Sequence, residues 1–291
     1  MVTGASAAEV TVVSSERTAG YVEALDVLVA ELARLNLPVS DVDLPTGGSL
    51  AAVLVQQKPK LIVTLGTEAL RQVLAQESRI PVLAALIPRT SFERVARASV
   101  SKAPIAALYL DQSMARQLDL VHLAFPTAQR VGVLFGGESI AQRTAISAAA
   151  AARSLVLVNG VVSPAHTVAN ALSDALDGSD ILLAVPDPQV FNPNTVANVL
   201  MSTYRARVPV VAFSPAYVRS GAALSLHTLP SQVGAQAAVL VRQFLQSGVL
   251  PASQYPLDFS ISVNERVARS MGLDLDARDL TELLRRLERK P

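Results

Sequence analysis

The feature that most constrains this chain is an alternation of short aliphatic runs with segments of helical periodicity. The apolar runs are Val10–Val13, Val39–Val42, Leu61–Leu65, Val82–Ile87, Ile105–Leu110, Val131–Phe135, Leu155–Val158, Ile181–Val185, Val208–Phe213 and Ala222–Leu226. Runs of about five residues that are apolar on both faces are typical of parallel strands covered by helices on each side. Between the runs, apolar residues recur at helical spacing, as in Tyr21–Leu32. The pattern predicts a doubly wound, parallel α/β architecture.

The alternation divides into two halves near Leu110–Asp111. Five strand–helix units precede this point and four or five follow it, so each half has the size of a mononucleotide-binding fold. No Gly/Ser-rich linker separates the halves. We therefore expect two α/β lobes, with residues 1–110 in the first and 111–226 in the second, joined by a short hinge.

Composition excludes several classes of function. The 25 Lys and Arg residues nearly balance 24 Asp and Glu, and no basic stripe predicts nucleic-acid binding. The absence of cysteine excludes disulfides, thiolate metal sites and cysteine nucleophiles. The three histidines, His122, His166 and His227, lie in unrelated elements without ligand-spaced partners, so no metal site is expected. The longest apolar runs are far shorter than the roughly 20 residues of a membrane-spanning helix.

Motifs for catalysis or cofactor binding are equally scarce. The chain has no G-x-S-x-G nucleophile elbow, no Walker loop and no G-x-G-x-x-G fingerprint. We therefore expect no cofactor, and a binding protein is favoured over an enzyme. The weaker alternative is an α/β enzyme that uses Asp187 or Glu138 as an acid or base.

Ligands of open α/β sheets bind beyond the carboxyl ends of the strands, so the residues that follow the apolar runs are the candidates. They are rich in small hydroxyl groups and turn formers. The candidate ligand-binding residues are Ser14, Ser15, Thr67, Arg89, Thr90, Gly136, Asp187, Phe191 and Tyr217.

Several of these candidates have an alternative structural role. The Arg89 guanidinium can bind a carboxylate in bidentate fashion, or it is simply a solvated surface group. Asp187 lies between two prolines, which suits a rigid contact to an ammonium or hydroxyl group, or it forms a turn that caps a helix over 192–204. Gly136 is either a tight-turn residue or a backbone contact to ligand. Phe191 and Tyr217 can form an aromatic wall of the site or belong to the core.

Seven segments in order along the chain resemble the ABC-transporter substrate-binding proteins related to the tryptophan and aromatic amino-acid receptors. The family's strand and turn "vTvGTpaA" is similar to Leu61–Ala69, and its "lPxakrvGvly" is similar to Phe125–Leu134. The other segments are 80–85, 181–187, 209–222, 232–238 and 263–273. The resemblance extends over about residues 9–275.

The resemblance implies a type I periplasmic-binding fold, in which two lobes joined by three crossovers close over a small ligand. It implies that residues 227–254 complete the first lobe and 255–291 the second, and that Ser14 or Ser15, Thr67 and Asp187 face the cleft. The sequence departs from the family at Ile87-Pro88-Arg89-Thr90, where the family has Asp-Pro, and at 106–112. Because both changes fall at the cleft or hinge, the ligand's identity does not transfer. An amino acid or a similar polar or aromatic solute is expected.

The resemblance also implies an exported, periplasmic protein. Ala5-Ser6-Ala7 has the small-x-small pattern that precedes a signal-peptidase cut, although it also fits an ordinary N-terminal tail. The expected partners are the small-molecule ligand and either the permease of an ABC importer or a membrane sensor protein. The sensor alternative rests on the altered hinge and on the charged helix beyond Ala277, whose leucine stripe either packs on its own lobe or docks a partner.

Overall fold

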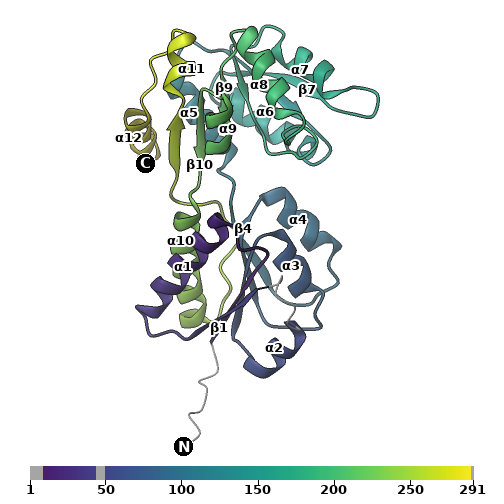
Figure 1. Ribbon diagram of the computed structural model, residues 1–291, viewed down its shortest axis with the longest axis vertical. Helices are drawn as coiled ribbons and strands as arrows, with labels where there is room; N and C mark the ends of the chain where they lie inside the picture. The colour runs from purple at the N-terminus through teal and green to yellow at the C-terminus, as the bar shows by residue number, and fades with distance from the viewer. Residues whose placement is uncertain (1–8, 44–49, 290–291) are drawn as a thin grey trace, which may run out of the picture. The chain divides into compact units, whose positions relative to one another are not determined.

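The computed structural model describes residues 9–43 and 50–289, so Ala5-Ser6-Ala7 lies outside the described residues. The chain forms two compact units, each built from two separate segments (Figure 1). Unit 1 comprises residues 1–111 and 228–258, and unit 2 comprises 112–227 and 259–291. The chain therefore passes from one unit to the other three times.

Unit 1 contains a five-stranded parallel sheet in the order β2-β1-β3-β4-β5. Its strands are β1 (Val10–Ser14), β2 (Val39–Asp43), β3 (Leu61–Leu65), β4 (Val82–Ile87) and β5 (Ile105–Tyr109). Its helices are α1 (Ala19–Ala33), α2 (Leu50–Gln57), α3 (Thr67–Leu74), α4 (Arg89–Ala98) and α10 (Pro230–Ser247). Every residue of β1, β3 and β4 is buried, because helices cover both faces of the sheet.

One face of this sheet is covered by a helix pair that the sequence separates by nearly 200 residues. Helices α1 and α10 pack side by side, and Leu28 and Val241 are both buried in the same core as β1 and β3 (Figure 1). The two backbones approach closely at Gly234, where an added Cβ would lie 2.4 Å from the carbonyl oxygen of Ala24. The absence of a side chain at this position is therefore required for the packing.

Unit 2 contains a six-stranded sheet in the order β11-β10-β9-β8-β6-β7. Its strands are β6 (Arg130–Phe135), β7 (Val156–Val161), β8 (Ile181–Leu183), β9 (Val210–Ala212), β10 (Leu224–His227) and β11 (Ser260–Val263). All pairings are parallel except that of β10 with β11. Its helices are α5 (Met114–Ala124), a short 3-10 helix η2 (Ile140–Gln142), α6 (Arg143–Ala151), α7 (Val168–Leu176), α8 (Val196–Arg205), α9 (Pro215–Ser220), α11 (Glu265–Ser270) and α12 (Ala277–Glu288).

The predicted fold class is confirmed: two mostly parallel sheets alternate with helices along the chain. Each of the ten apolar runs overlaps a strand, and β11 is the strand that the sequence analysis missed. This strand reads Ser-Ile-Ser-Val, and all four of its residues are only partly buried. A short, half-buried antiparallel strand at a sheet edge has none of the continuous apolar character that identified the other strands.

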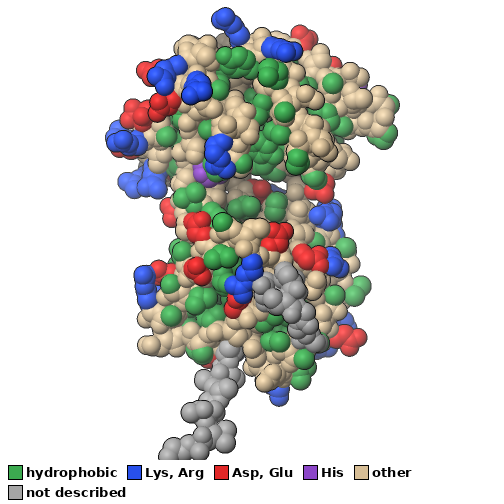
Figure 2. Space-filling view, viewed as in Figure 1, with side chains coloured by type: hydrophobic (Ala, Val, Ile, Leu, Met, Phe, Trp, Pro, Cys, Tyr) green, Lys and Arg blue, Asp and Glu red, His purple; other side chains and the backbone are tan. Residues whose placement is uncertain are grey.

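The charged C-terminal segment forms helix α12, as its periodicity predicts, and it packs on unit 2. Leu280 and Leu284 enter the unit 2 core, while Leu283 and Leu287 are 42% and 37% exposed. Two guanidinium groups lie over the ring of Phe259, that of Arg116 at 5.1 Å and that of Arg285 at 5.6 Å from the ring centroid. On the face shown in Figure 2, acidic and basic side chains lie interspersed on both units.

Candidate functional site

In unit 1, Ser14, Ser15 and Thr67 lie at the carboxyl ends of β1 and β3, which are paired strands. The Ser15 hydroxyl accepts a hydrogen bond from the Ala69 amide at 2.8 Å and thereby ties the end of β1 to the start of α3. Thr67 is the first residue of α3 and is half-buried. The Ser14 hydroxyl is buried and has no hydrogen-bond partner among the described residues.

The turn between β3 and α3 depends on Gly66, which has φ +90°. An added Cβ would lie 2.5 Å from the Tyr21 hydroxyl and 2.7 Å from the Ser15 hydroxyl. Burial raises the pKa of Tyr21. Two hydroxyl groups therefore lie directly against the backbone of this turn, at the edge where a ligand would bind.

Arg89 is the first residue of α4, at the carboxyl end of β4, and its guanidinium is fixed by two contacts. Its Nε donates to Glu93 at 2.7 Å, and its Nη1 donates to the Tyr255 hydroxyl at 2.8 Å. Its Nη2 has no acceptor among the described residues, and the side chain is 46% exposed. The arrangement leaves a positioned cationic group with donors available to an acceptor such as a carboxylate. Thr90 follows in the same helix, and its hydroxyl makes no hydrogen bond within the described part of the chain.

Aromatic rings and a carboxylate pack around Arg89 and fix its position. Tyr255 packs edge-on against Tyr109 with 5.2 Å between ring centroids, and Tyr109 packs on Phe92 at 5.9 Å. The Asp111 carboxylate accepts the backbone N–H of Arg89 at 2.5 Å. Burial raises the pKa of Asp111 to about 6, and the hydrogen bond from Arg89 opposes this shift only partly.

In unit 2, the structure brings Gly136 and Asp187 into contact at the carboxyl ends of β6 and β8. One oxygen of Asp187 accepts from the amides of Glu138 and Ser139 and from the Ser139 hydroxyl, at 3.1, 2.8 and 2.8 Å. The other accepts from the Gln189 amide at 2.9 Å. An added Cβ at Gly136 would lie 2.4 Å from Asp187, so only glycine fits beside this carboxylate.

Asp187 therefore holds the loop between β6 and η2 with one oxygen and its own turn after β8 with the other. The expected structural alternative is confirmed in part. Asp187 does form a turn, in which its carbonyl accepts from the Val190 and Phe191 amides, but it does not cap the following helix, because α8 begins at Val196 after Thr195. The carboxylate is buried and its acceptor positions are used by the protein's own amides. A ligand would meet the groups that this loop presents more readily than Asp187 itself.

The two aromatic candidates also come together. Phe191 lies in the segment between β8 and α8, and Tyr217 lies in α9, which follows β9. Their ring centroids are 6.0 Å apart, and the ring of Phe213 packs against both, with centroid distances of 5.8 and 4.9 Å. The Tyr217 hydroxyl donates to the Phe191 carbonyl at 3.3 Å, and burial raises the pKa of Tyr217. Phe191 is buried, whereas Phe213 and Tyr217 are partly exposed. The cluster thus provides an apolar, aromatic surface at the same edge of the sheet as Asp187.

Two buried polar side chains lie near the carboxyl end of β10. His227 is buried with its Nδ1 3.1 Å from the Ser225 hydroxyl, and burial lowers its pKa to about 4. It is therefore neutral at physiological pH. Gln117 donates to the Leu226 carbonyl at 3.1 Å, and its side-chain oxygen has no partner among the described residues.

Residues 9–43 and 50–289 contain no group of three His, Asp or Glu side chains that is arranged to hold a metal. In the same residues, no helix combines the length and the apolar character that crossing a bilayer requires. The candidate groups are hydroxyls and a guanidinium in unit 1, and an aromatic cluster in unit 2.

Four residues of these clusters were not among the candidates predicted from the sequence: Glu93, Asp111, Phe213 and Tyr255. Glu93 could have been found, because it is four residues after Arg89 within one helical pattern and such pairs are in contact. Phe213 follows Val210–Ala212 directly and lies at a strand end by the same rule that selected Tyr217. Tyr255 carries no local signal, since it reaches Arg89 across 166 residues of sequence.

The two α/β units, with a chain that passes between them three times, have the type I periplasmic binding fold. The family model described as "ABC transporter substrate binding protein" matches residues 16–276. The chain belongs to this family of substrate-binding proteins, which confirms the resemblance inferred from the sequence.

Three solved structures illustrate the same fold. A ligand-free substrate binding protein with adhesive properties from Clostridium difficile superposes with a TM-score of 0.74 and 17% identity, covering 93% of this chain and 96% of that chain. An ABC domain in complex with L-Trp from Streptococcus pneumonia superposes with a TM-score of 0.62 and 16% identity, covering 94% of this chain and 98% of that chain. A conserved domain protein from Vibrio cholerae superposes with a TM-score of 0.62 and 17% identity, covering 94% of this chain and 97% of that chain. No curated protein matches the chain at a significant level.

Proposed function

We propose that this protein is the periplasmic solute receptor of an ABC importer, and that its solute is a small molecule carrying a carboxylate and an apolar or aromatic part. The observation that carries the proposal is the pair of strand edges described above. Unit 1 offers the positioned guanidinium of Arg89, and unit 2 offers the aromatic cluster of Phe191, Phe213 and Tyr217. A solute that binds both Arg89 and the aromatic cluster would favour the conformer in which both units contact it.

Aromatic amino acids are the first candidates for this solute. They carry the carboxylate that a fixed arginine binds and a ring that packs edge-on against other rings. The streptococcal domain of the same fold was crystallised with L-Trp, which supports this choice. The α-ammonium group would find acceptors in the hydroxyls of Ser15 or Thr67, or in Glu93.

The ligand class is tested by isothermal titration calorimetry with L-tryptophan, L-phenylalanine and their carboxamides. We expect binding of the acids and a loss of at least tenfold for the amides, because the amides lack the charge that the guanidinium recognises. Arg89→Met should produce a similar loss for the acids and no further loss for the amides. Arg97→Met, which removes an arginine from the exposed end of the same helix, is the matched control and should bind normally. Equal affinity of acids and amides would refute the carboxylate assignment.

The importer role requires a separate measurement. Cells that lack the protein should lose uptake of the radiolabelled solute, and wild-type protein but not Arg89→Met should restore it. Restored signalling through a membrane sensor without restored uptake would establish the sensory alternative instead. Small-angle scattering with and without solute tests whether binding makes the molecule more compact.

A further inference from the structure

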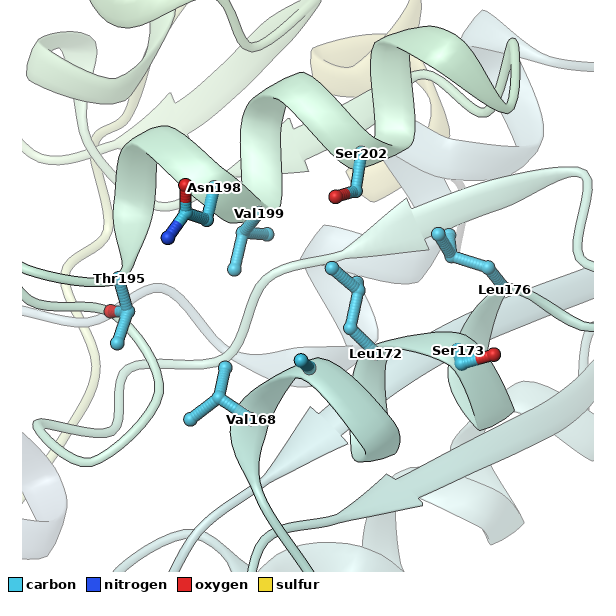
Figure 3. Close-up of a pocket in the computed structure, with 9 residues that line it drawn as sticks. Val168, Leu172, Ser173, Leu176, Thr195, Asn198, Val199 and Ser202 are labelled. Carbon is cyan, nitrogen blue, oxygen red and sulfur yellow. The ribbon is translucent and has the colours of Figure 1, made fainter.

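A pocket within unit 2 is lined by none of the candidate site residues described above. It has a volume of about 230 Å³ and is formed by helices α7 and α8 on the outer layer of the sheet (Figure 3). Leu172 and Val199 point into the space between the two helices, and both are nearly fully buried. Val168 and Leu176 extend the apolar lining along α7.

The rim of this pocket carries three solvent-exposed polar side chains that are not used in hydrogen bonds to other described residues. The Ser173 hydroxyl on α7, and the Asn198 amide and Ser202 hydroxyl on α8, make no hydrogen bonds within the described residues. Thr195, by contrast, is used by the protein, since its hydroxyl donates to the Val190 carbonyl at 2.6 Å. The rim therefore offers both donors and acceptors beside an apolar floor, which is the usual composition of a small-molecule site.

Size and charge define what fits. An apolar cavity of about 150 Å³ accommodates benzene, so about 230 Å³ accommodates a substituted single ring or two fused rings. None of the nine lining residues carries a charge. A charged ligand would leave its ion unpaired against Leu172 and Val199, which is unfavourable.

We propose that the pocket between α7 and α8 is a second ligand site, which binds a small uncharged ring compound bearing one or two hydrogen-bonding groups. The ring lies on Leu172 and Val199, and its polar substituent reaches Asn198, Ser173 or Ser202. This site is formed entirely within unit 2, and the proposal does not depend on the solute receptor function.

The test uses backbone amide NMR of the full chain with indole and p-cresol as uncharged probes, and benzoate as a charged probe of similar size. We expect saturable shifts at millimolar probe concentrations that map to residues 168–176 and 195–202. Benzoate should shift these amides at least tenfold more weakly. Absence of saturable shifts from both uncharged probes, or equal binding of benzoate, would overturn the proposal.

Variants of the lining separate this pocket from other sites. Ser173→Leu fills the space and should weaken indole binding at least tenfold. Ser147→Leu adds the same side chain at an exposed position of α6 in the same unit, and it should bind normally. If Ser173→Leu fails to fold, Asn198→Ala serves instead, with an expected loss of about threefold to tenfold for one hydrogen bond. Shifts that are unchanged in these variants, or that follow protein concentration because a second copy covers the pocket, would refute the assignment.

Discussion

Replacing Asp187 by alanine should destabilise unit 2 far more than an ordinary surface substitution. The carboxylate accepts four hydrogen bonds, and two of the donors, the amide and hydroxyl of Ser139, belong to a residue with no exposed surface. Each buried donor left without an acceptor costs about 1–3 kcal/mol, whereas the Glu138 and Gln189 amides can turn to water. We expect Asp187→Ala to lower the free energy of unfolding by about 3–5 kcal/mol. Asp187→Asn retains one acceptor and should cost about 1–2 kcal/mol.

A double-mutant cycle with Gly136 tests this reasoning. Gly136→Ala alone should cost about 2–3 kcal/mol, because its Cβ would lie 2.4 Å from the Asp187 carboxylate. In the double variant that carboxylate is gone, so the combined loss should be smaller than the sum by at least 1 kcal/mol. Urea unfolding followed by circular dichroism measures all four proteins. A loss below about 1 kcal/mol for Asp187→Ala, or strictly additive losses, would show that the carboxylate does not organise this loop.

Three further predictions concern other parts of the chain. As pH rises from about 4 through 6, the wild type should lose up to about 3 kcal/mol of stability, because the unfolded chain releases the Asp111 proton in this range and the folded protein retains it. Asp111→Asn should remove this loss. His227 has the opposite effect: between about pH 4 and 6.5 the wild type should gain about 3 kcal/mol of stability as pH rises, because the unfolded histidine is protonated there and the folded one is not. His227→Gln should remove this gain. Urea unfolding at a series of pH values checks both variants, and a pH dependence unchanged from the wild type would contradict the predictions. Gly234→Ala should cost about 2–4 kcal/mol by separating α1 from α10, whereas Gly20→Ala, whose Cβ would lie 3.5 Å from Pro230, should be nearly neutral; equal melting temperatures would contradict the close approach.

The strands were predictable because a strand that is buried on both faces is apolar at every consecutive residue. Leu61–Leu65 is identical in the sequence analysis and in β3, and all five residues are buried. Burial alone does not fix where a strand ends: β8 ends at Leu183, although the apolar run continues through Ala184 and Val185, which are also buried. Strand β11 was missed because two of its four residues are serines.

The candidate site was predictable in position more than in chemistry. The rule that ligands bind at the carboxyl ends of strands selected Asp187 and Gly136, and these residues do meet. In the structure, however, the Asp187 carboxylate accepts hydrogen bonds from the amides of the loop after β6. This arrangement depends on a turn geometry that no sequence pattern specifies. Tyr255 shows the other limit, because its contact with Arg89 depends on how a distant segment returns to the sheet.

The division of each unit into two segments determines when its core can be completed during synthesis. The core of unit 1 includes Val233, Val241 and Phe244, which follow Asp111 by up to 133 residues. At about 5–20 residues per second, the ribosome needs roughly 7–27 s to make that stretch. Unit 2 waits in turn for Leu280 and Leu284. The nascent chain thus exposes apolar strands of unit 1 until Phe244 has been made, and apolar strands of unit 2 until Leu284 has been made.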